Sequence, residues 1–176
     1  MSLPDRPNEG ASTGTGAYPL SANSLDSLVR YTPSAAGTSL VSAVDLPAGA
    51  LLTRITTSTP APSKRWSTVQ TGRDSHMELN SALLYMNHSC APAVELDVAR
   101  GEVRVSRKGQ GIKEGDPVTF FYPSTEWDFA APFSCLCGSE GCVGEVKGAK
   151  FIAREEMGRW WFNEHIVELA RERDGR

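Results

Sequence analysis

Short apolar runs separated by turn-forming residues dominate the chain between residues 37 and 123. In "AVELDVARGEVRVSRK", residues 93–108, apolar and polar residues alternate on both sides of Arg100 and Gly101, which predicts a β-hairpin. "GTSLVSAVDLPAGALLTRI", residues 37–55, has a turn at Pro47, Ala48 and Gly49 between two β-prone runs. "GIKEGDPVTFFYP", residues 111–123, has a turn before a buried strand. The pattern predicts a mainly β domain (α+β class) of short strands.

Helical spacing occurs in two places. In "ELNSALLYMN", residues 78–87, apolar residues recur three and four positions apart and predict a short amphipathic helix. The last segment predicts a C-terminal helix, because acidic residues lie near its start and Arg171 and Arg173 near its end, as the helix dipole favours. The apolar residues that would pack this helix on the domain are Met157, Trp160, Trp161, Val167 and Ala170.

Composition divides the chain into four parts. Residues 1–24 are rich in Ser, Gly, Pro, Thr and Asn, which predicts a disordered tail. We expect the main domain at residues 25–130, a cysteine-rich segment at residues 131–148 and the C-terminal helix at residues 149–176. A length of 176 residues fits one domain with such a tail.

Charge and hydropathy narrow the class of partner. The 18 basic and 21 acidic residues give a net charge of −3, which is too mild to indicate direct binding to nucleic acid or to a membrane. No apolar run approaches the ~20 residues of a membrane span. The N-terminus lacks the basic and apolar regions of a secretory signal. We therefore expect an intracellular monomer, nuclear or cytoplasmic.

Three of the four cysteines cluster in "SCLCGSEGC", and the fourth is Cys90. Four buried thiols that only pack as small apolar groups are one interpretation. A Cys-x-Cys-x4-Cys run in a glycine-containing loop favours another, because the glycines let several sulfurs face one ion. Structural zinc prefers a closed tetrahedron of thiolates, and one cysteine remains to complete it. We predict a zinc site at Cys90, Cys135, Cys137 and Cys142.

Three blocks, taken in order, resemble a SET domain followed by a post-SET zinc segment. They are "NHSC" at residues 87–90, "GDPVTFFY" at 115–122 and "CLCGSEGC" at 135–142. "GTSLVSAVDLPAGALL", residues 37–52, is similar to the family's N-terminal strand pair, so the resemblance covers about residues 35–150. The stretch at residues 120–142 looks like a compact branch found in fungi. The resemblance implies small curved β-sheets with a pseudoknot, followed by the zinc loop.

The resemblance also implies an activity: transfer of a methyl group from S-adenosylmethionine to a lysine side chain of a protein partner. By the same resemblance, Asn87, His88 and Gly37 contact the cofactor, and Tyr122 lies at the site of methyl transfer. Phe120 falls where the family carries Phe or Tyr to set the number of methyl groups added, and Phe implies a roomier site.

The residue types suit this chemistry. Methyl transfer needs a neutral amine held in line with a sulfonium methyl, with water excluded. Because a free lysine has a pKa of ~10.4, the site must disfavour the ammonium form. A channel lined by Phe120, Phe121 and Tyr122 would do so, and the Tyr122 hydroxyl can hydrogen-bond the amine. The alternative is that "VTFFY" is only a core strand.

Several residues depart from the family pattern and keep a second hypothesis open. Ser39, Ala93 and Phe121 stand where the family usually carries a glycine, an asparagine and an acid. The chain is then either a SET-type protein-lysine methyltransferase or a catalytically weak or silent SET-like module that binds a partner. A zinc-ribbon nucleic-acid binder is disfavoured, because the chain has no basic stripe.

Overall fold

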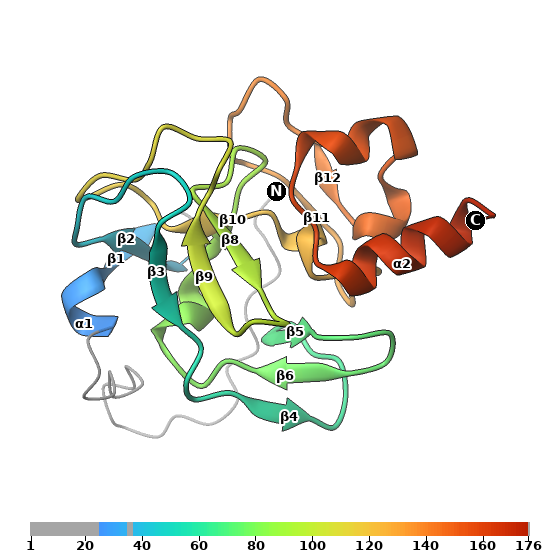
Figure 1. Ribbon diagram of the computed structural model, residues 1–176, viewed down its shortest axis with the longest axis horizontal. Helices are drawn as coiled ribbons and strands as arrows, with labels where there is room; N and C mark the ends of the chain where they lie inside the picture. Colours follow the sequence, from blue (N-terminus) through green and yellow to red (C-terminus); the bar gives the residue numbers. More distant parts are fainter. Residues whose placement is uncertain (1–24, 35–36, 176) are drawn as a thin grey trace.

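The computed structural model describes residues 25–34 and 37–175 (Figure 1). The predicted N-terminal tail, residues 1–24, lies outside the described residues. Small sheets of short strands make up most of the fold. The strands are β1 (Val29–Ser34), β2 (Gly37–Ser42), β3 (Leu51–Arg54), β4 (Thr59–Ala61), β5 (Thr68–Gln70), β6 (His76–Glu78), β7 (Asn87–His88), β8 (Val94–Asp97), β9 (Glu102–Val105), β10 (Thr119–Phe120), β11 (Phe133–Ser134) and β12 (Glu145–Val146). The mainly β fold class is confirmed.

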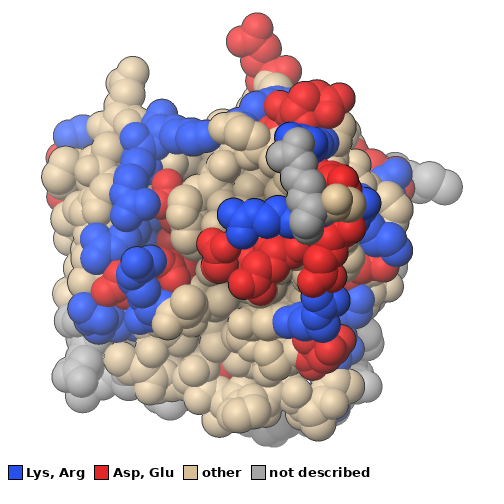
Figure 2. Space-filling view, turned by 45° about the vertical axis from the view of Figure 1, so that its right-hand side comes forward, with Lys and Arg blue, Asp and Glu red and all other residues tan. Residues whose placement is uncertain are grey.

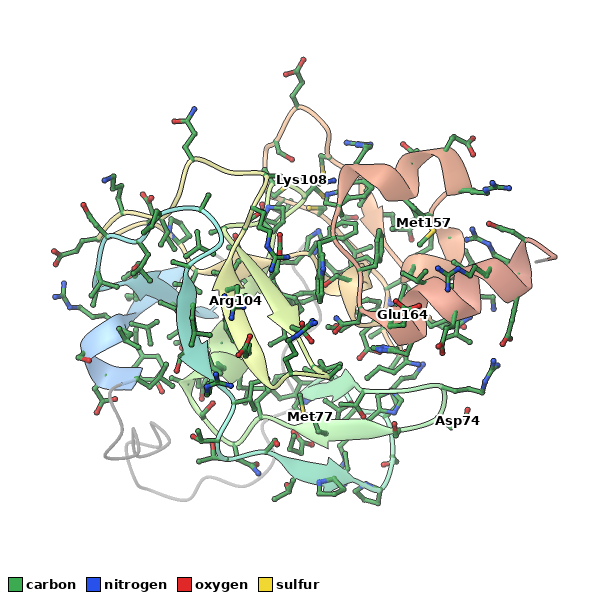
Figure 3. The ribbon with its side chains drawn as sticks, in the orientation of Figure 1. Asp74, Met77, Arg104, Lys108, Met157 and Glu164 are labelled. Atoms are coloured by element: carbon green, nitrogen blue, oxygen red, sulfur yellow. The ribbon has the colours of Figure 1, made fainter. Side chains whose placement is uncertain are left out.

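The predicted hairpin on either side of Arg100 and Gly101 forms as β8 and β9. The two strands pair antiparallel from Val94–Val105 to Asp97–Glu102, and Gly101 has the positive φ of 63° that the turn requires. β3 joins the other edge of β9 to complete a three-stranded sheet. Arg104 on β9 ties the two strands further, because its Nη1 donates to the Gly49 carbonyl at 3.2 Å (Figure 3). Apolar side chains of this sheet lie in the main hydrophobic core.

The two strands predicted within residues 37–55 both form, but they do not pair with each other. β2 pairs antiparallel with β1, whereas β3 pairs with β9. The turn between them is where it was predicted, and Gly49 has φ 78° while its N–H donates to the Val105 carbonyl at 3.0 Å. β4, β6 and β5 form a separate three-stranded sheet below the first (Figure 1).

The helices are shorter than the sequence predicts. The only helical part of residues 78–87 is the 3₁₀ turn η1 (Ala82–Tyr85), which the Ser81 hydroxyl caps by accepting from the Leu83 N–H. Helical segments also occur at α1 (Leu25–Leu28), η2 (Tyr122–Ser124) and η3 (Ala149–Phe151).

The predicted C-terminal helix forms, but it is shorter than the predicted segment, residues 149–176. The segment divides into η4 (Arg154–Arg159) and α2 (Glu164–Arg173), with an extended stretch between them that begins at Trp160, φ −121° and ψ 167°. The physical reason lies at Asn163. Its buried side-chain amide donates to the Leu96 and Ser124 carbonyls, each at 2.9 Å, and these bonds replace a helical turn.

Two apolar clusters hold the fold together. The larger one contains Leu40, Leu96, Val103 and Val118, all fully buried, from β2, the β8–β9 hairpin and the segment before β10. The smaller one joins Cys90, Phe121, Ile152 and Trp160, and so attaches the C-terminal segment to the domain. The domain boundaries predicted at residues 130 and 148 stay predictions.

The surface mixes charges of both signs. On the face shown in Figure 2 acidic and basic side chains lie next to one another. The exposed ion pairs of the described residues include Lys150–Asp128 and Arg171–Glu164. Within the described residues, no helix has the length and apolar character needed to cross a bilayer.

Candidate functional site

A two-residue parallel strand pair forms the frame of the site. β7 lies beside β10, with Thr119 opposite Asn87 and Phe120 opposite His88. The Ser89 N–H extends the pairing by donating to the Phe120 carbonyl at 3.1 Å. The structure therefore brings the "NHSC" and "VTFFY" motifs, about thirty positions apart in the sequence, side by side.

Tyr122 is held at both ends against this frame. Its hydroxyl donates to the Met86 carbonyl at 2.9 Å, and its backbone N–H donates to His88 Nδ1 at 3.2 Å. The Asn87 side-chain amide is partly exposed and makes no hydrogen bond to the described residues, so it is available to a ligand. Three of the predicted site residues thus occupy one place: Asn87, His88 and Tyr122.

Aromatic rings surround Tyr122. Its ring centroid lies 4.7 Å from that of Phe120, which supports the predicted proximity of these two residues. Phe129 stacks on Tyr122 at 6.0 Å, and Phe133 meets it edge-on at 6.1 Å. Sequence reasoning missed Phe129 and Phe133, because they lie in an irregular stretch with no periodicity. The only signal in the sequence was their position between Tyr122 and Cys135, two residues already assigned to the site.

The structure does not bring Phe121 to this group. Successive strand side chains point to opposite faces, so Phe121 turns away from Phe120 and Tyr122. It is 2% exposed and stacks on Trp160, with centroids 4.2 Å apart and rings nearly parallel. We therefore leave Phe121 out of the channel that was predicted to include it.

Gly37 begins β2 with φ 101°, a conformation that glycine adopts readily. β2 runs beside the segment that leads into β10, because the Val118 N–H donates to the Leu40 carbonyl at 2.9 Å. The role of Gly37 in cofactor contact stays a prediction.

The four predicted metal ligands converge. The Sγ atoms of Cys90, Cys135, Cys137 and Cys142 all lie within 4.8 Å of one another, and those of Cys90 and Cys135 are 3.8 Å apart. Zinc–sulfur bonds of about 2.3 Å place tetrahedral sulfurs about 3.8 Å apart, so the donor set fits that ion. All four thiols are free of disulfides.

Hydrogen-bond donors point at these sulfurs, as suits thiolates. The Val143 N–H lies 3.4 Å from Cys90 Sγ, and the Gly144 N–H lies 3.4 Å from Cys142 Sγ. Burial opposes ionisation at Cys137, but hydrogen bonds with Ser139, Cys90 and Cys135 together lower the pKa of Cys137 to about 6, whereas burial raises the pKa of Cys90 to about 11. A low thiol pKa favours metal binding, because the ligand is the thiolate.

His88 lies between the cysteine cluster and Tyr122. Its Nε2 is 3.3 Å from Cys90 Sγ, while its Nδ1 accepts the Tyr122 N–H. Burial lowers the pKa of His88 to about 4, so the ring is neutral at physiological pH. Both ring nitrogens are therefore engaged within the protein, and any contact of His88 with a cofactor would have to come from its backbone or ring face.

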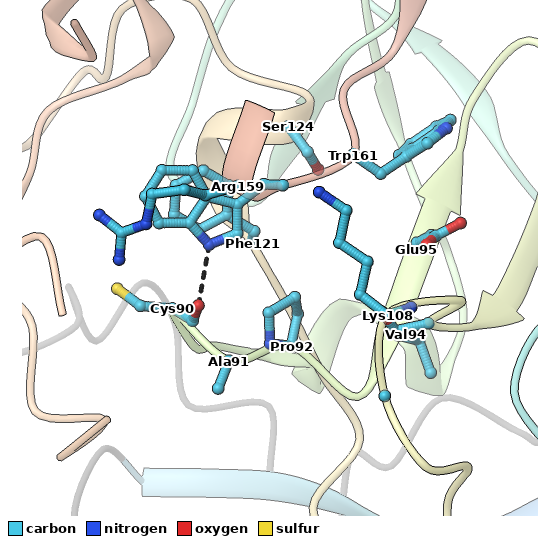
Figure 4. Close-up of a pocket in the computed structure, with 13 residues that line it drawn as sticks. Cys90, Ala91, Pro92, Val94, Glu95, Lys108, Phe121, Ser124, Arg159 and Trp161 are labelled. Carbon is cyan, nitrogen blue, oxygen red and sulfur yellow. Dashed lines mark hydrogen bonds between the residues drawn. The ribbon is translucent and has the colours of Figure 1, made fainter. Parts of the chain in front are cut away.

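A pocket of about 230 Å³ lies on the other side of the Cys90 loop (Figure 4). Pro92 and Val94 line one wall, and Trp160 and Trp161 line another. The Trp160 indole N–H donates to the Cys90 carbonyl at 2.8 Å, which fastens the C-terminal segment to this loop. The pocket contains none of Asn87, His88 and Tyr122, so it is separate from the site that they form.

Comparison with known proteins defines the class of the fold and then the family. No family model matches the sequence. The SET-domain protein KRYPTONITE, in its crystal structure with mCHG DNA and SAH, superposes with a TM-score of 0.52 and 17% identity over 66% of this chain and 28% of that chain. The fold is that of SET-domain proteins.

One relative is much closer in sequence. The methyltransferase flvH of Aspergillus flavus is 49% identical over 128 residues, which are 73% of this chain and 71% of that protein. At this identity and coverage, the chain belongs to the same methyltransferase family as flvH.

Proposed function

We propose that the protein is an S-adenosylmethionine-dependent N-methyltransferase that acts on a lysine side chain of a protein. Membership of the flvH family supports methyl transfer, and SAH in the KRYPTONITE complex is consistent with this cofactor. The observation that carries the proposal is the hydrogen bond from the Tyr122 hydroxyl to the carbonyl of Met86, the residue directly before Asn87. A methyl donor and an amine acceptor can meet at that point.

The acceptor side is apolar. Phe120, Phe129 and Phe133 surround the Tyr122 ring and would exclude water from the approaching amine. Exclusion of water disfavours the ammonium form, so the amine reaches the site with its lone pair free. Because the Tyr122 hydroxyl gives its proton to the Met86 carbonyl, it can act toward the amine only as an acceptor of an N–H, which would fix the direction of the amine.

The bound cofactor would supply an electrophilic methyl on a sulfonium. The amine nitrogen would take this methyl, the C–S electron pair would stay with the departing thioether sulfur, and the product ammonium would give its extra proton to solvent on leaving the site. The protein's contribution is position and exclusion of water rather than a strong base. We assign Asn87 to the cofactor side and Tyr122 to the amine side.

We further propose that Cys90, Cys135, Cys137 and Cys142 hold a structural zinc ion. It would pin the loop at residues 135–142 to the "NHSC" motif and so close the site on the side of Phe133. Metal analysis of the purified protein is expected to give one zinc per chain, and Cys137→Ser and Cys90→Ser are each expected to lose it. Full zinc in Cys90→Ser would remove Cys90 from the ligand set.

The test of the activity uses two variants and one matched control. With labelled cofactor and a lysine-containing peptide, Tyr122→Phe is expected to lower kcat about 100-fold while cofactor affinity stays near normal. Asn87→Ala is expected to weaken cofactor affinity first. Tyr85→Phe removes a phenol outside the site and should change neither. Transfer to free lysine but not to any protein would refute the proposal of a protein substrate, while the proposal of methyl transfer would stand.

A second function is favoured by one observation. Phe121 stands where the SET family usually carries an acid, and it is committed to packing on Trp160. A catalytically silent module that binds a partner would tolerate Phe121 in place of the acid, because it has no reaction to support. A ligand raises the melting temperature in proportion to RT ln(1 + [L]/Kd), so no thermal shift at millimolar S-adenosylmethionine would favour the silent module.

A further inference from the structure

We propose that the pocket beside the Cys90 loop binds a small carboxylate that carries an apolar ring, with the carboxylate held between Lys108 and Ser124. One wall of this pocket comes from the loop after β7 and from the β8–β9 hairpin, and the other comes from the C-terminal segment at Trp160 and Trp161 (Figure 4). The pocket lies apart from the proposed site of methyl transfer, so the proposal stands independently of the proposed function.

A buried hydroxyl without a partner opens into the pocket. Ser124 is 3% exposed, and its backbone is fully bonded, because its N–H donates to the Phe121 carbonyl at 2.8 Å and its carbonyl accepts from Asn163. Its side-chain hydroxyl has no hydrogen-bond partner among the described residues. Figure 4 shows the oxygen of Ser124 directed into the pocket. Because buried polar groups are nearly always paired in folded proteins, this hydroxyl indicates that the pocket receives a polar ligand.

A positively charged donor points to the same place. Lys108 extends from the loop after β9 into the pocket, with its Nζ directed toward Ser124 (Figure 4). Nζ donates to the Gly158 carbonyl at 2.6 Å, which holds the ammonium across the two walls. An ammonium has three donors, so two remain for a ligand. The ammonium and the Ser124 hydroxyl do not bond to one another, and an acceptor group can lie between them.

The other charged groups of the lining are committed within the protein. Glu95 Oε1 accepts the Arg107 N–H at 3.1 Å, and Oε2 lies 3.3 Å from Arg107 Nη1. Arg159 pairs with Glu156 and donates to the Gly141 carbonyl. The lysine ammonium and the serine hydroxyl keep donors to offer, so the matching ligand group is an anionic acceptor. A carboxylate fits, because its two oxygens can each take one of these donors.

The two tryptophans of the pocket differ in what they contact. Trp160 stacks on Phe121 at 4.2 Å, and the Arg159 guanidinium lies 4.3 Å from its ring, so both faces of that ring are covered. Trp161 is partly buried and contacts no other ring or cation within the part of the chain that the structure describes. Trp161 and Pro92 therefore offer apolar surface to a ligand, and an aromatic ring packs well against an indole.

The volume limits the size of the ligand. A pocket of about 230 Å³ is smaller than the usual range of about 300 to 1,000 Å³ for small-molecule sites. It accommodates one ring and one carboxyl group rather than a larger cofactor. We therefore use phenylacetate as the probe, phenylacetamide as its uncharged isostere and the peptide Ala-Ala-Phe as a carboxylate at a chain end.

The experiment follows the indole N–H signals of Trp160 and Trp161 by ¹⁵N NMR of the full chain during titration with each probe. Phenylacetate is expected to give a saturable shift with a Kd in the millimolar range, as about ten non-hydrogen atoms allow. Phenylacetamide is expected to bind about tenfold more weakly or worse, because it lacks the charge that pairs with Lys108.

Two variants and one control test the assigned donors. Ser124→Ala removes a hydroxyl that bonds to no described residue, so the Tm should stay unchanged while phenylacetate affinity falls about tenfold. Lys108→Met should lower the affinity by a similar factor. Lys113→Met is the matched control, because Lys113 is an exposed lysine that pairs with Asp45 outside the pocket, and it should bind phenylacetate normally.

Four results would overturn the proposal. They are the absence of any shift at about 20 mM phenylacetate, equal binding of phenylacetate and phenylacetamide, normal affinity in both Ser124→Ala and Lys108→Met, and tighter binding of Ala-Ala-Phe than of phenylacetate. The last result would assign the pocket to the end of a peptide instead of a free acid.

Discussion

Replacement of Glu126 by glutamine is expected to stabilise the protein above neutral pH. Glu126 is 7% exposed, and its Oε1 accepts the Gln70 N–H at 2.6 Å. Its Oε2 lies 3.9 Å from His76 Nε2, a buried nitrogen with no hydrogen-bond partner among the described residues. Burial lowers the pKa of His76, so at neutral pH the two groups do not form an ion pair. The ionised Glu126 carboxylate is therefore buried without a positively charged partner to offset its loss of solvation.

The magnitude follows from the titration of this one group. Burial raises the pKa of Glu126 from 4.5 to about 7, against smaller opposing effects of the Gln70 N–H and Lys64. The folded state therefore binds the proton more tightly than the unfolded state. The stability that Glu126 contributes is fully present below pH 4.5 and is lost as the pH rises through about 7. Linkage between these two values gives a loss of about 2.5 kcal/mol from pH 5 to pH 8.

The assay is denaturant unfolding of the wild-type protein and of Glu126→Gln from pH 5 to pH 8. The variant keeps the acceptor for Gln70 and has no carboxyl to titrate, so its advantage should grow by about 2.5 kcal/mol over this range, or about 5 to 10 °C in Tm. Glu155→Gln, at an exposed position, is the control and should show no such trend. Parallel stability–pH curves for Glu126→Gln and the wild type would refute the reasoning.

Substitutions at three further positions test the packing. Gly148→Ala should cost roughly 2 to 4 kcal/mol of unfolding free energy, because φ is 119° and the new Cβ would clash with the Trp127 carbonyl oxygen; an unchanged Tm would contradict it. Asn163→Asp keeps the acceptor for the partly buried Val98 N–H but loses two donated bonds, so chemical denaturation should show a loss of roughly 2 to 4 kcal/mol. Trp160→Phe keeps a ring on Phe121 and should cost about 1 kcal/mol. Trp160→Ala should cost roughly 3 to 5, and equal losses in the two would refute the assigned stacking.

Local pattern was enough to predict the elements that depend on neighbours in sequence. The β8–β9 hairpin forms where strict alternation and Gly101 predict it, because both signals act over a few residues. The convergence of the cysteines also followed from local spacing, since three of them share one loop and only Cys90 remained. The motif resemblance then assigned Asn87, His88 and Tyr122 to one site, and in the structure the Tyr122 N–H bonds to His88.

The errors arise where distant partners decide the conformation. Helical spacing continues through Trp160 to Asn163, but these residues bond to the Cys90, Leu96 and Ser124 carbonyls, and those bonds outweigh the helix. Phe121 reads as part of one aromatic run with Phe120, although the alternation of a strand sends the two rings to different clusters. Pairing of β2 with β1 rather than β3 likewise has no local signature.

The anchoring of Asn163 has a consequence for how the chain is made. Its side-chain amide donates hydrogen bonds to the carbonyls of Leu96 and Ser124, and Ser124 lies 39 positions earlier in the chain. At synthesis rates of about 5 to 20 residues per second, the Ser124 carbonyl waits roughly 2 to 8 s for that partner. During this interval, Phe121 and the part of the β8–β9 hairpin that the C-terminal segment later covers have no partner in the nascent chain. A chaperone that shields this face would act most usefully between the emergence of residue 124 and that of residue 163.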